Sequence, residues 1–143
     1  MDDGNVEILL VEDNPKDLEL TLHALKKNNL ANEIHVARDG AEALDFFFGP
    51  NAHGRSNKPR LILMDLKLPK VSGIEVLKQL KSNSETKSIP IVVLTSSTTE
   101  KDIAECYEFG ANSYLRKPID FNSFVESAKT IGLYWLLMNK IPP

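Results

Sequence analysis

Five short apolar segments alternate with segments of helical spacing along this chain. The runs ILLV and IVVL show no alternation of apolar and polar residues, which is typical of strands buried on both faces. The five predicted strands are VEILLV at 6–11, EIHVA at 33–37, RLILMD at 60–65, PIVVLTS at 90–96 and NSYLRK at 112–117.

Between these strands, apolar residues recur at the spacing of amphipathic helices. In the first such segment Asn14 is a good N-cap before Pro15, and Leu18, Leu22 and Leu25 share one face. The other predicted helices are DGAEALDFFF opened by Asp39, SGIEVLKQLK, TEKDIAECYEFGAN ended by Gly110 in a left-handed cap, and a fifth from Asp120 with Phe124, Ala128, Ile131 and Trp135 in phase. Lys78 and Lys81 are predicted on a solvated helix face.

Alternating strands and helices predict an α/β fold, a doubly wound parallel sheet with helices on both faces. A chain of 143 residues is expected to form one domain over 1–143 with no output module. The polar segment 49–59, with two glycines and two prolines, is predicted to be a long loop.

Composition narrows the function classes. The net charge of −3 gives no basic field, which argues against direct nucleic-acid binding. No apolar run of about 20 residues is present to span a membrane, and the acidic start does not resemble a signal peptide. A single cysteine, Cys106, fits a reducing compartment, so we expect a cytoplasmic protein.

Three carboxylates follow predicted strands. Glu12 and Asp13 end the first strand and Asp65 ends the third. Because the carboxyl ends of parallel strands meet at one edge, we expect these acids to lie together. Their mutual repulsion favours protonation of one acid or binding of a cation, and an all-oxygen ligand set suits Mg²⁺ or Mn²⁺.

Hydroxyl and ammonium groups are expected at the same edge. Thr95 and Ser96 end the fourth strand, and Lys117, followed by Pro118, ends the fifth. A lysine and a hydroxyl supply a point charge and a hydrogen-bond donor, which is what a phosphoryl group needs.

The motifs ILLVEDN, LILMDLKLPKVSG, IVVLTSS and YLRKP resemble, in order and spacing, the receiver domain of two-component response regulators. The resemblance implies a flavodoxin-like (CheY-like) strand order of 2-1-3-4-5. It implies that Asp65 accepts a phosphoryl group from a sensor histidine kinase. It also implies that Glu12, Asp13, Asp65 and the backbone carbonyl of Lys67 hold the metal ion.

The same resemblance assigns roles to the remaining residues. Lys117 and Thr95 would contact the phosphoryl group, Ser96 would leave room for it, and the Lys117–Pro118 peptide would be cis. Thr95 and Tyr114 would act as the switch. Partners would then read the face formed by the fourth helix, fifth strand and fifth helix.

Two departures from the common receiver pattern carry further expectations. Lys67, two residues after Asp65, and Ser97, two after Thr95, predict an atypical dephosphorylation rate. The apolar tail and the loop at 49–59 resemble stand-alone regulators of cyanobacterial phytochromes. We therefore expect a phytochrome-like kinase, a downstream protein or phosphotransfer partner, and a homodimer with Tyr134, Trp135 and Leu136 at its face.

Other function classes fit the sequence less well. An aspartate-nucleophile phosphatase usually has a second acid two residues after the nucleophile, where this chain has Lys67. Nucleotide or flavin binding lacks a glycine-rich phosphate loop after the first strand. A receiver that has lost phosphorylation remains an alternative, although every site residue is present. The sequence thus predicts a phosphorylation-controlled signalling protein rather than a classical enzyme.

Overall fold

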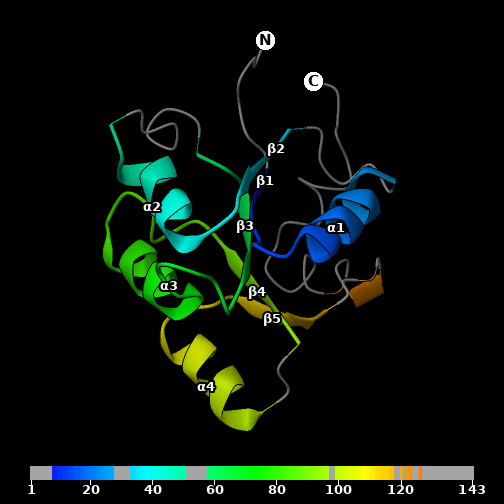
Figure 1. The fold of residues 1–143 in the computed structure, drawn as a ribbon. Helices are drawn as coiled ribbons and strands as arrows, with labels where there is room; N and C mark the ends of the chain where they lie inside the picture. Colours follow the sequence, from blue (N-terminus) through cyan, green and yellow to red (C-terminus); the bar gives the residue numbers. More distant parts are fainter. Residues whose placement is uncertain are drawn as a thin grey trace, which may run out of the picture.

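A computed structural model describes residues 8–27, 33–50, 58–96, 99–117, 120, 122–123 and 126. Its centre is a five-stranded parallel sheet in the order β2-β1-β3-β4-β5 (Figure 1). The strands are β1 (Ile8–Val11), β2 (Ile34–Ala37), β3 (Leu61–Asp65), β4 (Ile91–Thr95) and β5 (Ser113–Arg116). The expected fold class and strand order are confirmed.

Four helices connect the strands, and each begins where its capping residue predicts. They are α1 (Pro15–Lys27), α2 (Gly40–Phe48), α3 (Gly73–Ser82) and α4 (Glu100–Glu108). Oδ1 of Asn14 accepts hydrogen bonds from the N–H groups of Lys16 and Asp17, and Asp39 caps α2 in the same way. The α4 helix ends in a Schellman arrangement in which Gly110 has φ +105°, so the predicted left-handed cap is confirmed.

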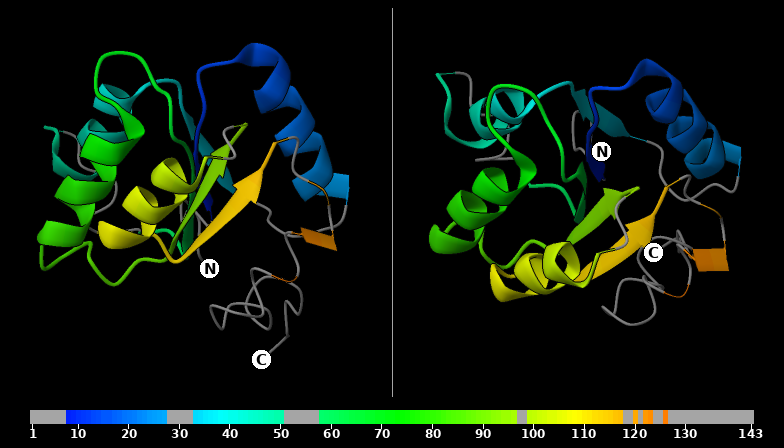
Figure 2. Two further views of the ribbon diagram at one scale, coloured as in Figure 1. Left: turned by 90° about the horizontal axis from the view of Figure 1, so that it is seen from below. Right: turned by 60° about the horizontal axis from the view of Figure 1, so that its bottom comes forward.

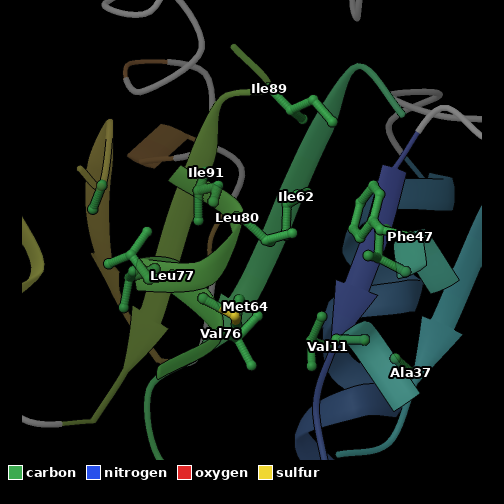
Figure 3. Close-up of a cluster of buried hydrophobic side chains, with 14 of the residues drawn as sticks. Val11, Ala37, Phe47, Ile62, Met64, Val76, Leu77, Leu80, Ile89 and Ile91 are labelled. Carbon is green, nitrogen blue, oxygen red and sulfur yellow. The ribbon is translucent and has the colours of Figure 1, made fainter. Parts of the chain in front are cut away.

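The helices cover both faces of the sheet. The views in Figure 2 place α1 on one face and α2, α3 and α4 on the other. Leu18 and Leu25 of α1 join one buried cluster, which includes Leu10 and Leu63 of the sheet. The second, larger cluster lies between the sheet and the helices α2 and α3 (Figure 3), and it includes Val11, Phe47, Ile62, Met64, Val76, Leu77, Leu80 and Ile91. The central strands are therefore buried on both faces, as their unbroken apolar runs predict.

The prediction that Lys81 lies on a solvated helix face is wrong. Its side chain is half-buried, and Nζ donates to the carbonyl oxygens of Lys87 (3.1 Å) and Ile89 (2.8 Å) and to Oδ1 of Asn112 (3.2 Å). Burial lowers the pKa of Lys81. The lysine thus joins the end of α3 to the segments that precede β4 and β5.

Several predictions concern parts of the chain outside the described residues. These are the cis peptide at Pro118, Ser97, the middle of the 49–59 loop, most of the fifth helix, and the dimer residues Tyr134, Trp135 and Leu136. Asp120 accepts hydrogen bonds from the N–H and O–H of Ser123, as a helix cap would. No helix in the described ranges is long and apolar enough to cross a membrane.

Candidate functional site

The sheet register brings the predicted carboxylates to one edge. Val11 of β1 pairs with Met64 of β3, so Glu12, which directly follows β1, and Asp65, the last residue of β3, are neighbours. The N–H of Glu12 continues the ladder to the carbonyl oxygen of Ala37 (3.0 Å). Parallel pairing therefore fixes the two acids side by side, as the sequence predicts.

Glu12, Asp13 and Asp65 form a compact acidic cluster. One carboxylate oxygen from each lies within 4.8 Å of the others. Glu12 and Asp65 are buried, while Asp13 is exposed and leaves the cluster open to solvent. At an effective dielectric near 20, such carboxylates repel by about 3 kcal/mol per pair. A hard divalent cation that keeps part of its water shell fits this oxygen-only set.

Lys117 offsets part of this negative charge. Its Nζ lies 2.7 Å from Oε1 of Glu12, 2.9 Å from Oδ2 of Asp65 and 3.0 Å from Oδ2 of Asp17. Burial alone would lower the pKa of Lys117, but the contacts with the carboxylates of Glu12, Asp65 and Asp17 together raise it above the ordinary value. The ammonium therefore stays protonated in the site.

Glu12 is the most deeply buried acid of the site. Burial raises its pKa, and the close contact with the Lys117 ammonium and the hydrogen bond from the N–H of Asn14 oppose that rise. The bond from Asn14 reaches Oε2 at 3.1 Å, whereas the close contact of Oε1 with Nζ of Lys117 is an ion pair outside hydrogen-bond angles. A buried carboxylate held in this way accommodates positive charge beside it at little cost in reorganisation.

Sequence reasoning missed Asp17. The residue lies in the first turn of α1, where an acid is ordinarily explained by the helix dipole. Its contact with Lys117 joins residues 100 positions apart. The one available signal is that α1 starts two residues after Asp13, so its first turn must lie above the same edge of the sheet.

The chain matches a known protein family over most of its length. Residues 8–129 match the response regulator receiver domain family. This chain is a response regulator receiver domain. Such domains belong to two-component signalling systems, so the protein is a signalling domain of the CheY-like type.

Curated relatives of this receiver domain span nearly its whole length. It is 42% identical over 135 residues to the probable methanogenesis regulatory protein FilR2 of Methanothrix harundinacea, covering 94% of this chain and 86% of the relative. It is 38% identical to response regulator Rcp1 of Synechocystis sp., covering 94% and 92%.

Solved structures of phytochrome-associated regulators share the fold. The bacteriophytochrome response regulator AtBRR is 48% identical with a TM-score of 0.82, covering 94% of this chain and 98% of that one. The Mn(2+)-bound form of Rcp1 is 36% identical (TM-score 0.74, coverage 96% and 97%). The phosphorylated cyanobacterial phytochrome response regulator RcpA is 33% identical (TM-score 0.75, coverage 96% and 97%).

The remaining predicted site residues of the receiver domain lie around the same edge. Thr95 is buried at the end of β4, and its carbonyl oxygen accepts the N–H of Lys117 (3.0 Å). Ser96 and Lys67 are exposed, and the N–H of Lys67 donates to Oδ1 of Asp65 (3.3 Å). Tyr114 is half-buried in β5, opposite Val93.

Proposed function

We propose that this receiver domain is a switch in which Asp65 accepts a phosphoryl group from a sensor histidine kinase in a Mg²⁺-dependent reaction. One observation carries the proposal: Nζ of Lys117 lies 2.9 Å from Oδ2 of Asp65, beside the cluster that Asp65 forms with Glu12 and Asp13. A nucleophilic carboxylate, a fixed cation and a place for a metal ion are the components that phosphoryl transfer requires.

The residues divide the work of transfer. A carboxylate oxygen of Asp65 attacks phosphorus, the O–P bond forms as the P–N bond to the kinase histidine breaks, and the ring nitrogen keeps the electron pair. Lys117 would bind the phosphoryl oxygens as their charge grows. Glu12, Asp13, Asp65 and the carbonyl oxygen of Lys67 would hold Mg²⁺ or Mn²⁺. The bound ion would neutralise charge on the carboxylates and on the transferred group.

Thr95 and Tyr114 are the residues proposed to transmit the change. Phosphorylation adds about two negative charges at Asp65. The Thr95 hydroxyl would turn toward the new oxygens, next to the space that Ser96 leaves. On β5, Tyr114 lies two residues before Arg116, the residue that pairs with Thr95 of β4. We expect the ring of Tyr114 to move when Thr95 does. Partners would read the resulting change on the face of α4 and β5.

Kinases of the phytochrome type are the proposed phosphodonors. The similarity to AtBRR, Rcp1 and RcpA supports this choice. A downstream protein or a phosphotransfer protein would receive the signal, and homodimerisation stays part of the proposal. FilR2, which is 42% identical to this chain, is named for the regulation of methanogenesis. Phosphotransfer assays with purified kinases are therefore needed to identify the phosphodonor.

The central experiment is intact-mass analysis after incubation with acetyl phosphate, with Mg²⁺ or with EDTA. The parent should gain one phosphoryl mass only with the metal, while Asp65→Asn should gain none. Asp45→Asn, which removes an exposed acid of α2, is the matched control and should behave as the parent. Phosphorylation of Asp65→Asn, or none of the parent, would refute the proposal.

Two further measurements separate the finer parts of the proposal. Transfer from a phosphorylated phytochrome-type kinase should be faster than from an unrelated histidine kinase. Comparing Lys67→Asn with the parent tests the unusual lifetime, because equal lifetimes would exclude a role for Lys67. Turnover of a phosphate ester beyond one equivalent would favour the phosphatase alternative.

A further inference from the structure

Three carboxylate groups surround the ammonium of Lys117, which has three N–H groups. Nζ donates hydrogen bonds to Asp65 and Asp17 and forms an ion pair with Glu12. In this structure Nζ lies within 3.0 Å of three carboxylate oxygens, from Glu12, Asp65 and Asp17. A phosphoryl group on Asp65 that approached Lys117 directly would compete with these carboxylates for the same ammonium.

The three partners differ in how firmly they are held. Glu12 is fully buried, and its second oxygen accepts the N–H of Asn14, so release would strand a carboxylate away from water. Asp65 carries the acceptor oxygens. The Asp17 side chain is 33% exposed, so water can replace Lys117 as its partner. Asp17 is therefore the partner that can be released at least cost.

We propose that Asp17 is a positioning residue that holds Lys117 in the unphosphorylated protein and yields this ion pair to the incoming phosphoryl group. The inference rests on the proposed phosphorylation of Asp65. Asp17 competes with the phosphoryl oxygens for the same ammonium. It therefore slows phosphorylation and weakens the contact between Lys117 and the phosphoryl group on Asp65.

A second property of Asp17 acts in the same direction. Glu12, Asp17 and Asp65 place three carboxylates around one ammonium, and Asp17 is the one that does not belong to the cluster of Glu12, Asp13 and Asp65. Neutralising Asp17 removes a negative charge near the path of an anionic donor and leaves all three acids of that cluster in place. Its effect should therefore be on Lys117 and the phosphoryl group rather than on assembly of the metal site.

Asp17→Asn is the test variant, and Glu19→Gln is its matched control. Glu19 is an exposed acid on the same helix, for which the described residues show no ion pair. Both changes remove one charge and keep the side-chain shape. The rate of phosphorylation by acetyl phosphate is measured at saturating Mg²⁺, so that weaker metal binding cannot change it. Binding of beryllium fluoride with Mg²⁺, followed by thermal shift, gives a second readout without group transfer.

Asp17→Asn should react about fivefold faster than the parent and bind beryllium fluoride about fivefold more tightly, as coupling within one ion-pair network implies. Glu19→Gln should stay near the parent in both readouts, and Asp17→Glu, which keeps the charge, should lie nearer the parent than Asp17→Asn does. An Asp17→Asn rate equal to or below that of the parent, or an equal gain in Glu19→Gln, would overturn the inference. If the parent itself is not phosphorylated on Asp65, the proposed function fails first.

Discussion

Nζ of Lys117 lies 2.9 Å from Oδ2 of Asp65, although 52 residues separate the two in the sequence. Lys117 also contacts Glu12 and Asp17, so one cation stabilises carboxylates that β1, α1 and β3 bring together. The stability of this edge and its chemistry thus depend on the same side chain.

Lys117→Met should destabilise the protein more without Mg²⁺ than with it. Loss of one partner of a fully buried pair costs about 3–5 kcal/mol, and we expect about 2 kcal/mol here because the edge is partly solvated. Mg²⁺ should recover part of the loss, because binding to the folded state stabilises it. Urea denaturation in EDTA and in Mg²⁺ measures both values, with Lys16→Met, an exposed lysine of α1, as control. An equal loss in the two buffers would contradict this account.

Gly73→Ala should displace the backbone at Asp65. A Cβ atom at Gly73 would lie 2.5 Å from the carbonyl oxygen of Asp65 and 2.6 Å from that of Leu66, and these are backbone atoms. Overpacking of this kind costs about 1–3 kcal/mol, and we expect the upper end. The free energy of unfolding, measured by urea denaturation, should fall, and so should the phosphorylated fraction of the folded protein. Gln79→Ala, an exposed change on α3, should alter neither by a comparable amount.

Asp39→Asn should cost stability at neutral pH and little in acid. The hydrogen bond from the N–H of Glu42 lowers the pKa of Asp39, and Lys70 adds to the effect. The folded state then binds fewer protons than the unfolded state, so this contribution is full above the ordinary pKa and disappears as pH falls through the lowered one. Asn keeps the helix cap, whereas Asp39→Ala should lose about 1 kcal/mol more than Asp39→Asn at either pH.

Unfolding curves of the parent, Asp39→Asn and Asp39→Ala between neutral and strongly acid pH would measure this. The difference between parent and Asn should shrink toward low pH, and the additional loss of Ala relative to Asn should persist. A parent–Asn difference that stays constant with pH would show that the carboxylate charge contributes nothing.

Lys81→Met should destabilise the far end of the sheet. Three oxygen acceptors lose a charged donor, and the carbonyl oxygen of Ile89 is the closest, at 2.8 Å. Because the site is only half-buried, we expect a loss of about 1–2 kcal/mol in urea denaturation. Lys87→Met changes an exposed lysine nearby and should lie within about 0.5 kcal/mol of the parent. A similar loss in both variants would remove the special role of Lys81.

The sequence predicts the sheet and helices well because local signals agree with the global fold. Unbroken apolar runs identify buried parallel strands, and Asn14, Asp39 and Gly110 are found at the helix ends that their chemistry favours. The position of Glu12 beside Asp65 follows from parallel pairing alone. For these features, sequence pattern and tertiary structure contain the same information.

Asp17 and Lys81 show where such reasoning stops. Both lie on helices, at places where a charged residue is ordinary, and nothing local shows what each side chain reaches. Asp17 contacts Lys117, 100 positions away, and one of the three acceptors of Lys81 belongs to Asn112, 31 positions away. Only the packing of helices onto the sheet brings these groups together. Contacts of this length depend on tertiary geometry, which hydrophobic period and capping do not encode.

The three acceptors around Lys81 make the two ends of the sheet electrically unlike. There one positive charge sits among neutral oxygens, whereas the opposite end gathers acids around a single amine. Changes of ionic strength or of bound ions will therefore act mainly on the acidic end, while the structure of the end around Lys81 stays unchanged. Amide hydrogen exchange, which reports each end separately, would display that contrast within a single molecule.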